Sequence, residues 1–362
     1  MNAEPLRSAL LAWYDAHARD LPWRVAPAAR AAGRKPDPYR VWLSEVMLQQ
    51  TTVPHATPYF LKFLAAWPTV TDLANAEDGE VMAAWAGLGY YARARNLLAC
   101  ARAVARDHAG RFPETEEGLR GLPGLGPYTA AAVAAIAFDR PANVVDGNVE
   151  RVMARLFALE APLPEAKPEL KRLAGALVGD DRPGDWAQAL MDLGAVVCRP
   201  KTPLCDRCPI APHCAALAAG DPESYPRRSR KPDRPHRYGV AYLLTRGEEV
   251  ALVRRPPSGL LGGMLALPTS DWRAGRWSET EALAAAPAPA AWRPAGEVEH
   301  GFTHFTLTLA LLRAEGEAPG VIWSPRRGLG ALPSVFLKAA RAGLLARESA
   351  EGDRPSKPAR AG

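Results

Sequence analysis

Apolar residues recur at helical spacing along the first 215 residues of the chain, in segments rich in Ala, Leu and Arg. Proline and glycine signals, such as the Pro-Gly pairs at 123–124 and 183–184, separate these segments. The pattern predicts an all-α region that ends near residue 215. Its expected helices cover residues 39–51, 78–86, 93–109, 129–138 and 149–156.

The pattern changes beyond residue 236, where apolar and polar positions alternate as they do in half-buried strands. Two strands, at 238–245 and 250–254, flank a glycine-containing turn and predict a hairpin. A third strand is expected over 305–311, and a helix over 334–346. This mixture of elements predicts a second domain of the α+β class.

The stretch that joins these two regions is polar and crowded with proline, serine and arginine, as in DPESYPRRSRKPDRP. This composition predicts an extended, charged linker. Its basic run is either solvated or lies along phosphates, and the sequence leaves both interpretations open. The expected organisation is a helical domain over 1–215, the linker over 216–235, an α+β domain over 236–348 and a disordered tail over 349–362.

Composition narrows the class of protein without identifying it. The 362 residues carry a formal net charge of +6 with a sequence pI near 9.1, which weakly favours a polyanionic partner such as nucleic acid. No apolar run is long enough for a membrane span, and the N-terminus lacks the apolar block of a secretory signal. We therefore expect no membrane association. Five cysteines in such a chain do not suggest a disulfide scaffold.

Four of the five cysteines lie close together in a proline-rich loop. Cys198, Cys205, Cys208 and Cys214 follow the spacing C-x6-C-x2-C-x5-C, so their thiolates can surround one metal centre. Zinc and a [4Fe–4S] cluster both satisfy four sulfur ligands, and the spacing alone does not choose between them. The fifth, Cys100, lies among apolar residues and is expected to be a small buried side chain.

The segment LPGLGPYT at 122–129 stands between two predicted helical segments. Gly124 and Gly126 allow backbone amides to turn outward, directly before the next helix begins. Exposed amides at a helix N-terminus attract phosphate without reading base sequence. An ordinary interhelical turn would use the same residues, so both interpretations remain open.

Two carboxylates stand in contrasting local settings. Glu45 has no basic residue at the helical positions three and four away, so it either reaches solvent or is desolvated with a raised pKa. Asp146 precedes a predicted helix, where it would act as a cap, keep a low pKa and stay ionised. One protonated and one ionised carboxyl form the pair that glycosidic-bond cleavage requires. The sequence does not show whether the two meet, and each also suits a purely structural role.

In combination and in this order, the motifs resemble the helix-hairpin-helix DNA glycosylase superfamily with its iron–sulfur loop, and within it the adenine DNA glycosylase (MutY) family. The likeness spans nearly the whole chain apart from the tail. It implies a multidomain protein with an all-α helix-hairpin-helix glycosylase domain and [4Fe–4S] loop, followed by a C-terminal α+β Nudix-like domain. The segments that carry it are WLSEVMLQQT at 42–51, GLGYYARARNL at 87–97, LPGLGPYTA at 122–130, VVDGNVERV at 144–152, the cysteine loop, RRPPSGLLGG at 254–263 and GFTHFTL at 301–307.

The resemblance implies excision of adenine mispaired with 8-oxoguanine or guanine in double-stranded DNA, as a step of base excision repair. The base must leave the stack, because its glycosidic bond is inaccessible inside the duplex. Glu45 would then protonate adenine N7, and Asp146 would stabilise the sugar cation. Tyr128 and Asn148 would support that centre by hydrogen bonds. The ligands implied for the [4Fe–4S] cluster are Cys198, Cys205, Cys208 and Cys214.

The resemblance also implies further contacts with DNA. Gln50 and Tyr90 would wedge into the gap beside the oxidised guanine, and the glycines of the hairpin would hold the backbone. The loop of Phe302, Thr303 and His304 aligns with the one that senses the lesion, although the family usually has serine at 303. The positions implied for the base pocket and its rim are Trp23, Arg24, Leu48, Gln49 and Gln188. Without the resemblance, Trp23 and Leu48 would equally suit a core, and Gln50 the end of a helix.

One position separates two subtypes of the superfamily. Relatives that also cut the strand have a lysine after the hairpin, whose amine forms a Schiff base with the sugar. Tyr128 occupies this position, so we expect a monofunctional enzyme without efficient strand cleavage. Two other functions remain open: a pyrimidine glycosylase with lyase activity, and a non-catalytic DNA-binding protein whose cluster senses redox state.

Two regions depart from the patterns of related proteins. The segment 270–286 lacks the carboxylates with which Nudix hydrolases bind magnesium, so pyrophosphate hydrolysis is not expected. The segment 25–35, before the catalytic helix, is longer than usual and has no assigned role. By resemblance we also expect a monomer in the bacterial cytoplasm, associated with the nucleoid.

Overall fold

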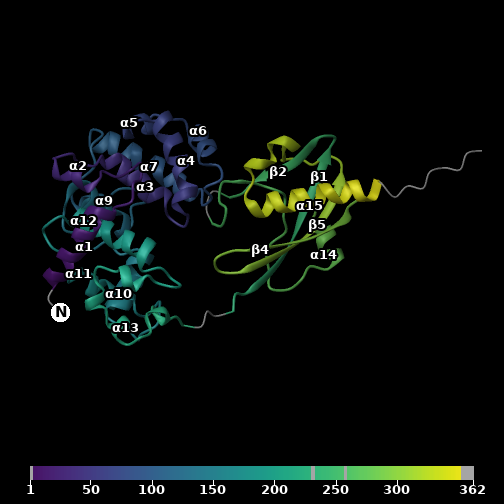
Figure 1. The fold of residues 1–362 in the computed structure, drawn as a ribbon. Coiled ribbons are helices and arrows are strands. Elements are labelled where there is room, and N and C mark those ends of the chain that lie inside the picture. Colours follow the sequence, from purple (N-terminus) through teal and green to yellow (C-terminus); the bar gives the residue numbers. More distant parts are fainter. Residues whose placement is uncertain (1–2, 230–232, 257–258, 352–362) are drawn as a thin grey trace, which may run out of the picture. The chain divides into compact units, whose positions relative to one another are not determined.

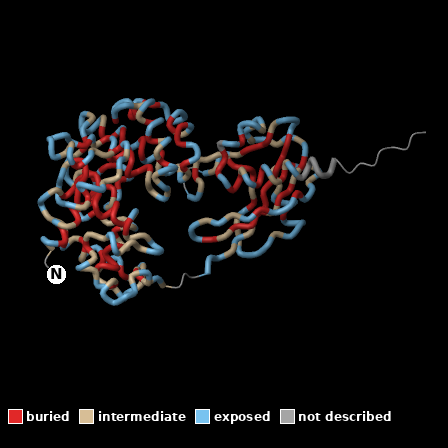
Figure 2. Tube along the Cα trace, in the orientation of Figure 1, coloured by how far each residue is buried: buried red, intermediate tan, exposed pale blue. Residues whose placement is uncertain are grey.

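The computed structural model describes residues 3–229, 233–256 and 259–351, and the chain divides into two compact units, Met1–Arg230 and Lys231–Gly362. Unit 1 is helical and unit 2 contains the sheet (Figure 1). Each unit has a buried core of its own, which is typical of an independently packed domain (Figure 2).

The helices of unit 1 begin at local sequence signals. The side chains of Asp37, Thr69, Thr115 and Asp146 each accept a hydrogen bond from a backbone amide in the first turn of the helix that follows. Within the described residues, the helices of unit 1 are α1 (Ala3–His17), α2 (Pro27–Ala31), α3 (Pro38–Met47), α4 (Val53–Ala66), α5 (Val70–Ala74), α6 (Asp78–Trp85), α7 (Ala92–Asp107), α8 (Glu116–Arg120), α9 (Pro127–Phe138), α10 (Gly147–Leu156), α11 (Lys167–Gly175), α12 (Pro183–Asp192) and α13 (Ala215–Ala218).

Helix α9 lies at the centre of unit 1. Its residues from Thr129 to Ala137 are all buried, and it packs against α3, α8 and α12. Alanine is its commonest residue, and small side chains let neighbouring helices approach closely. As a result α3, α9 and α12, which carry Glu45, Tyr128 and Gln188, meet around one part of the core.

The predicted helix over 39–51 is too long at its C-terminal end. Helix α3 ends at Met47, and Gln50 has a left-handed backbone conformation with a φ of 58°. A right-handed helix cannot continue through such a residue. The other predicted helices correspond to α6, α7, α9 and α10, with ends that differ by at most two residues.

The prediction of an extended linker from residue 216 is wrong for residues 216–229. Helix α13 continues to Ala218, and the side chain of Tyr225 is buried in the core of unit 1. Leu163 pairs with this segment through backbone hydrogen bonds, to the carbonyl of Arg227 at 2.8 Å and from the amide of Ser229 at 3.2 Å. The apolar residues of the segment therefore bind it to unit 1, and residues 230–232 of the predicted linker lie outside the described residues.

Unit 2 is built on a mixed sheet. The predicted hairpin is confirmed, because β1 (His236–Arg246) and β2 (Glu249–Arg254) are antiparallel. Strand β5 (Thr306–Glu315) pairs with β1 in parallel and covers most of the strand predicted over 305–311. The strand order is β3-β2-β1-β5-β4, with β6 paired to β2, where β3 is Leu265–Ala266, β4 is Arg293–Gly301 and β6 is Ile322–Pro325.

Helices pack on the sheet according to the alternation along β1. Ala241 and Leu243 share a core with residues of α15 (Ser334–Glu351), whereas Tyr242 donates a hydrogen bond of 2.7 Å to the Ala282 carbonyl of α14 (Glu279–Ala284). The predicted helix over 334–346 is confirmed. It continues to residue 351, so the first part of the predicted disordered tail is helical; residues 352–362 lie outside the described residues.

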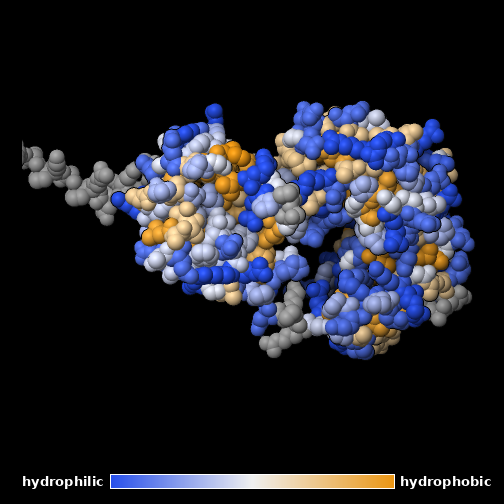
Figure 3. All heavy atoms as spheres, turned by 180° about the vertical axis from the view of Figure 1, so that it is seen from behind, coloured by the Kyte–Doolittle hydropathy of each residue, from blue (hydrophilic) through white to orange (hydrophobic). Residues whose placement is uncertain are grey.

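Hydrophilic residues cover most of the face shown in Figure 3, with hydrophobic residues in scattered patches. In the described part of the chain, no helix combines the length and the apolar character that crossing a bilayer demands.

Candidate active site

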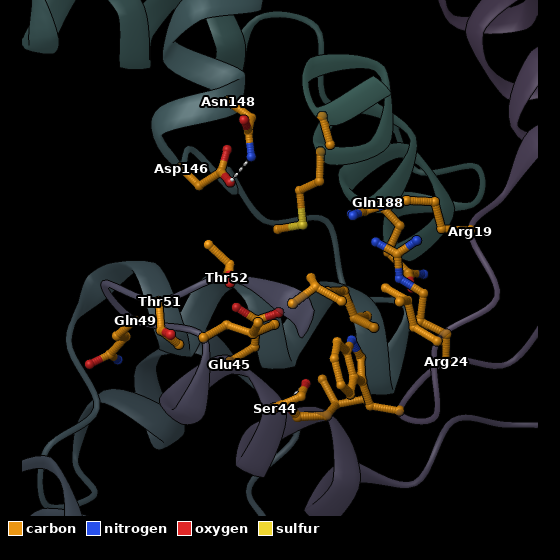
Figure 4. A pocket seen from close by; sticks show the side chains of 18 of the residues that line it. Arg19, Arg24, Ser44, Glu45, Gln49, Thr51, Thr52, Asp146, Asn148 and Gln188 are labelled. Atoms are coloured by element: carbon orange, nitrogen blue, oxygen red, sulfur yellow. Dashed lines mark hydrogen bonds between the residues drawn. The ribbon is translucent and has the colours of Figure 1, made fainter. Parts of the chain in front are cut away.

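A cavity of about 670 Å³ in unit 1 collects most of the predicted site residues. This volume is typical of pockets that bind small molecules. Glu45 and Asp146 both face it, from different helices (Figure 4). The predicted site residues that line it are Trp23, Arg24, Glu45, Leu48, Gln49, Gln50, Tyr128, Asp146, Asn148 and Gln188.

Glu45 lies on the buried face of α3. Asp37 caps this helix, and Pro38 starts it at the first position, so the local sequence sets where the turns of α3 fall. Glu45 is only 7% exposed, and Tyr128 Oη donates a hydrogen bond of 2.9 Å to its Oε2. Burial raises the pKa of Glu45 to about 7, and the negative charge of Asp146 adds to the rise. Of the two alternatives for Glu45, the structure therefore favours the desolvated acid.

Asp146 combines the role of a helix cap with a place in the cavity. Its Oδ1 accepts a hydrogen bond of 2.7 Å from the Val149 amide, and its Oδ2 accepts one of 3.0 Å from Asn148 Nδ2. The prediction of a low pKa is wrong: burial raises the pKa of Asp146 above its usual value, against the opposing effect of these hydrogen bonds. The hydrogen bonds at the helix start do lower the pKa of Asp146, but desolvation by burial outweighs them.

The two carboxyls differ in the donors that surround them. Val149 and Asn148 donate to Asp146, and hydrogen bonds to a carboxylate favour its ionised form. The side-chain donor to Glu45 is the Tyr128 hydroxyl. Glu45 is therefore the group that holds a proton near neutral pH, and Asp146 is the better supported anion.

Tyr128 lies on the first turn of α9, next to both carboxyls. Burial and the neighbouring charges of Glu45 and Asp146 raise the pKa of its phenol well above the usual value. Tyr128 therefore remains a neutral hydrogen-bond donor. Its side chain has no amine that could attack a sugar carbon.

Other residues that line the cavity offer an aromatic ring and polar side chains, which suit contact with a planar base. The Trp23 ring is 7% exposed and packs edge-on against Phe60, with 5.2 Å between ring centroids. Gln188 is 2% exposed and donates a hydrogen bond of 3.1 Å to the Gly184 carbonyl. Arg24 points into the same space from the segment before α2 (Figure 4). This part of the lining combines an aromatic surface with polar groups that are held in place.

Arg19 lines the cavity, and Asp192, which does not line it, pairs with both Arg19 and Arg24; neither residue was predicted from the sequence. Asp192, at the end of α12, is fully buried. It accepts hydrogen bonds of 2.6 Å from Arg24 Nη1 and 2.5 Å from Arg19 Nε. The signal was present in the sequence, because Asp192 interrupts the apolar run ALMDLGAVV in the same way that Glu45 interrupts its own helix face.

The two predicted wedge residues lie on neighbouring loops. Gln50 follows α3 and lines the cavity, whereas Tyr90 precedes α7, is 56% exposed and is not part of the cavity lining. Gln49 lines the cavity and donates a hydrogen bond of 3.3 Å to Thr129 Oγ1. The structure thus brings Gln49 and Gln50 to the cavity and leaves Tyr90 on the surface beside the loop that carries them.

The predicted hairpin joins α8 and α9. Gly124 has a φ of 74°, and a Cβ at this position would lie only 2.6 Å from Asn96 Cβ, so glycine is required there on two counts. Gly126 is the residue directly before α9 and has an ordinary extended conformation. The structure thus requires glycine at 124 but not at 126, and the predicted binding of phosphate by the hairpin amides stays a prediction.

All four clustered cysteines line one small cavity, and none of them forms a disulfide. Arg155 is 2% exposed and donates a hydrogen bond of 3.3 Å to Cys198 Sγ, which suits a thiolate. Among the described residues, no three His, Cys, Asp or Glu side chains gather closely enough to hold a single metal ion. Four thiols that line one cavity fit a centre with four sulfur ligands, and both one zinc ion and a [4Fe–4S] cluster are such centres.

Phe302, Thr303 and His304 lie in unit 2. They form a tight turn in which the Phe302 amide donates to the Phe305 carbonyl at 2.8 Å. The Phe302 ring packs against Phe305 and Trp272, with centroid distances of 4.8 and 5.7 Å. Thr303 and His304 are exposed at the tip of this turn.

Comparison with known families agrees with this fold. Residues 43–175 match the HhH-GPD superfamily base excision DNA repair protein, and residues 239–340 match the NUDIX domain. The solved structure of a thermostable thymine-DNA glycosylase is 30% identical to this chain, with a TM-score of 0.52. The matched region covers 60% of this chain and 97% of that glycosylase. The fold and the cavity thus define a DNA glycosylase of the helix-hairpin-helix class, with a Nudix-like second domain.

Curated relatives narrow the class to a family. The adenine DNA glycosylase of Homo sapiens is 39% identical over 374 aligned positions, which cover 86% of this chain and 68% of that protein. The adenine DNA glycosylase of Mycolicibacterium smegmatis is 37% identical over 254 positions, covering 70% and 81% respectively. The chain belongs to the adenine DNA glycosylase family, so the family predicted from its motifs is confirmed.

Proposed function

We propose that this chain removes adenine mispaired with 8-oxoguanine or guanine from double-stranded DNA, by hydrolysis of the N-glycosidic bond. The observation that carries the proposal is the buried acid Glu45, with a pKa of about 7, facing Asp146 across one cavity. A base that has left the duplex fits a cavity of about 670 Å³. A pair of carboxyls with different proton affinities supplies the acid and the anion that the reaction needs.

The reaction begins with transfer of the Glu45 proton to N7 of the flipped adenine. The bond between C1′ and N9 then breaks, its electron pair leaves with the base, and positive charge develops on the sugar. The Asp146 carboxylate stabilises that cation, through a transient bond to C1′. Glu45, now ionised, accepts a proton from water as the water attacks C1′. The bond between C1′ and Asp146 breaks and its electron pair returns to the carboxylate, so the enzyme regains its initial state with an abasic sugar as product.

The remaining residues hold the base and the sugar in place. Arg24 and Gln188 face the base edge, and Trp23 and Leu48 supply apolar surface. Asp192 pairs with Arg24 and keeps its guanidinium at the cavity wall. Asn148 and Tyr128 orient the two carboxyls by hydrogen bonds. Because Tyr128 has no amine, the reaction stops at the abasic site without efficient strand cleavage.

Recognition of the DNA uses three further parts of the chain. The hairpin with Gly124 and Gly126 binds phosphates through backbone amides. Gln50 and Tyr90 enter the duplex beside the lesion, and the turn of Phe302, Thr303 and His304 reads the 8-oxoguanine. The chain acts as a monomer on the DNA of a bacterial nucleoid.

The cysteine loop holds the cofactor in this proposal. Cys198, Cys205, Cys208 and Cys214 bind a [4Fe–4S] cluster, which when present cross-links a loop that has little core of its own. A brown protein with absorbance near 400 nm would support the cluster, and a colourless zinc protein would exclude it.

An alkali-resolved assay on a duplex with adenine opposite 8-oxoguanine tests the activity. We expect strand breaks at the adenine only after alkali treatment. Breaks without alkali would instead indicate a glycosylase with lyase activity, and no breaks would indicate a protein that only binds DNA. A duplex with thymine opposite guanine completes the test, because preferential cleavage there would overturn the assignment of adenine as substrate.

A further inference from the structure

The two proposed wedge residues share an unusual backbone conformation. Gln50 has a φ of 58° and Tyr90 a φ of 49°, so both lie in the left-handed region that side-chain-bearing residues rarely adopt. They stand on separate loops, one after α3 and one before α7. Two disfavoured conformations at two functional positions require contacts that hold them.

Arg93, on the first turn of α7, makes those contacts with both loops. Its Nη1 donates a hydrogen bond of 2.6 Å to the Gln49 carbonyl, directly before Gln50. Its Nη2 donates bonds of 3.0 and 3.4 Å to the carbonyls of Leu88 and Gly89, directly before Tyr90. One guanidinium thus binds the peptide group that precedes each left-handed residue.

Charge and packing add to this arrangement. Arg93 Nη1 also donates to the Val46 and Met47 carbonyls, at 3.1 and 3.2 Å, where the end of α3 carries partial negative charge. The guanidinium carbon lies 5.3 Å from the centroid of the Trp85 ring and 5.5 Å from that of Tyr90. A lysine would keep the positive charge but could not reach both loops with a rigid fork of donors.

We propose that Arg93 is a positioning residue that sets Gln50 and Tyr90 as a pair before DNA binds. It acts through the two loops and does not itself touch the reacting atoms. The inference rests on the proposed function, in which both side chains enter the duplex while the adenine flips out. Arg93 therefore governs the flipping step, and the chemistry of Glu45 and Asp146 proceeds as before once the base is in the cavity.

The test compares Arg93→Lys with Arg95→Lys, a matched control on the same helix whose side chain is exposed. Under single-turnover conditions on adenine opposite 8-oxoguanine, we expect Arg93→Lys to lose about 10- to 100-fold in excision rate, since small misplacements of positioning groups have effects of this size. Arg95→Lys should stay within a factor of about three, because lysine keeps the positive charge of this exposed side chain, and sequence-independent contact with DNA depends on that charge. Equal rates for Arg93→Lys and wild type would overturn the proposal.

Two further readouts separate positioning from a general loss of structure. With 2-aminopurine in place of the adenine, the rise in fluorescence on flipping should be smaller in Arg93→Lys, while the pH midpoint of excision stays where it is in wild type. In a double-mutant cycle with Gln50→Ala and Tyr90→Ala, the effect of Arg93→Lys should largely disappear, because the residues it acts through are gone. A fully additive effect, or a shifted pH midpoint, would contradict the proposal. Inactivity of wild type and Arg95→Lys alike would instead refute the proposed function.

Discussion

The middle of α3 and the start of α10 present the same chemical group, a carboxyl, to one cavity in two different environments. Glu45 sits on a buried helix face, where its side-chain donor is the Tyr128 hydroxyl. Asp146 caps a helix, where a backbone amide and Asn148 both donate to it. Burial raises the pKa of both, and the contrast comes from the fuller burial of Glu45 and from the additional hydrogen-bond donors at Asp146. A helix interior and a helix end thus give two carboxyls in one cavity different surroundings, as the proposed roles of acid and anion require.

Among the substitutions considered, loss of the acidic proton of Glu45 should lower the rate of adenine excision most. Glu45→Gln keeps the shape of the side chain but cannot act as an acid. We expect the single-turnover rate of adenine excision to fall roughly 10²- to 10⁴-fold, the range usual for a general acid–base group. Affinity for the lesion duplex, measured by fluorescence anisotropy, should stay within a few-fold of wild type.

A surface glutamate provides the control for that variant. Glu80→Gln, on the exposed side of α6, should leave both rate and affinity unchanged. Normal excision by Glu45→Gln would mean that the assigned acid is wrong.

Loss of the negative charge of Asp146 should cause the next largest fall in the excision rate. Asp146→Asn retains a good helix cap, so the free energy of unfolding should change by less than about 1 kcal/mol. The excision rate should fall about 10²- to 10³-fold, because a preorganised charge no longer faces the sugar cation. Asp37→Asn, which changes the cap of α3 outside the cavity, is the matched control. A large loss of thermal stability with an unchanged rate would show that Asp146 is only a cap.

Asp192→Asn tests the polar part of the cavity lining. It leaves Arg19 and Arg24 without their buried anion, so we expect the free energy of unfolding to fall by about 3 kcal/mol. The uncompensated charge of Arg24 should also lower the pKa of Glu45, and the pH midpoint of excision should move down. Chemical denaturation and a pH–rate profile measure the two effects. Asp139→Asn serves as the control, because Asp139 forms a half-exposed ion pair with Arg30. It should change the free energy of unfolding and the pH midpoint of excision only slightly.

Tyr128→Phe should have the smallest effect on rate, up to about tenfold, because it removes one hydrogen bond. That bond lowers the pKa of Glu45, so its loss should move the pH midpoint of excision upward from about 7. Tyr128→Phe should raise the pH midpoint of excision and Asp192→Asn should lower it. A general loss of stability would not shift the midpoint in opposite directions in the two variants. Shifts in the same direction would contradict the assignment of the midpoint to Glu45.

Because the pKa of Glu45 is raised in the folded protein, its contribution to the free energy of unfolding should decrease as the pH rises. Between the ordinary value of 4.5 and about 7, the folded protein holds a proton that the unfolded chain releases. The contribution of Glu45 to stability is therefore full below pH 4.5 and is lost as the pH rises to about 7. Glu45→Gln should flatten this part of the stability profile measured by thermal melting.

Local patterns in the sequence were enough to predict the helical first unit, the β1–β2 hairpin and helix α15. They failed where long-range contacts decide the structure. Helix α3 ends before residue 51, where Gln50 is left-handed and Arg93, far along the chain, binds the carbonyls of Met47 and Gln49. Residues 216–229 pack on unit 1 because Leu163 pairs with them, although their composition is typical of a linker.

In the candidate site too, local sequence predicted some features, whereas others depend on long-range contacts. The chemical character of Glu45 could be inferred from its apolar helix face, but its burial depends on α9 packing beside α3. The pKa of Asp146 was predicted in the wrong direction, because a helix start says nothing about how much water the fold leaves there. Asp192 was missed because its two arginine partners lie at the other end of unit 1 in sequence.

The central claim is that Glu45 is protonated near neutral pH while it faces Asp146. A carbon-13 NMR titration of the glutamate carboxyls, with Glu45→Gln to assign the signal, measures this directly in the free protein. We predict a midpoint near 7 for Glu45, and a lower midpoint in Asp146→Asn, where the neighbouring negative charge is gone. A midpoint near the ordinary value of 4.5, unchanged by Asp146→Asn, would contradict the claim.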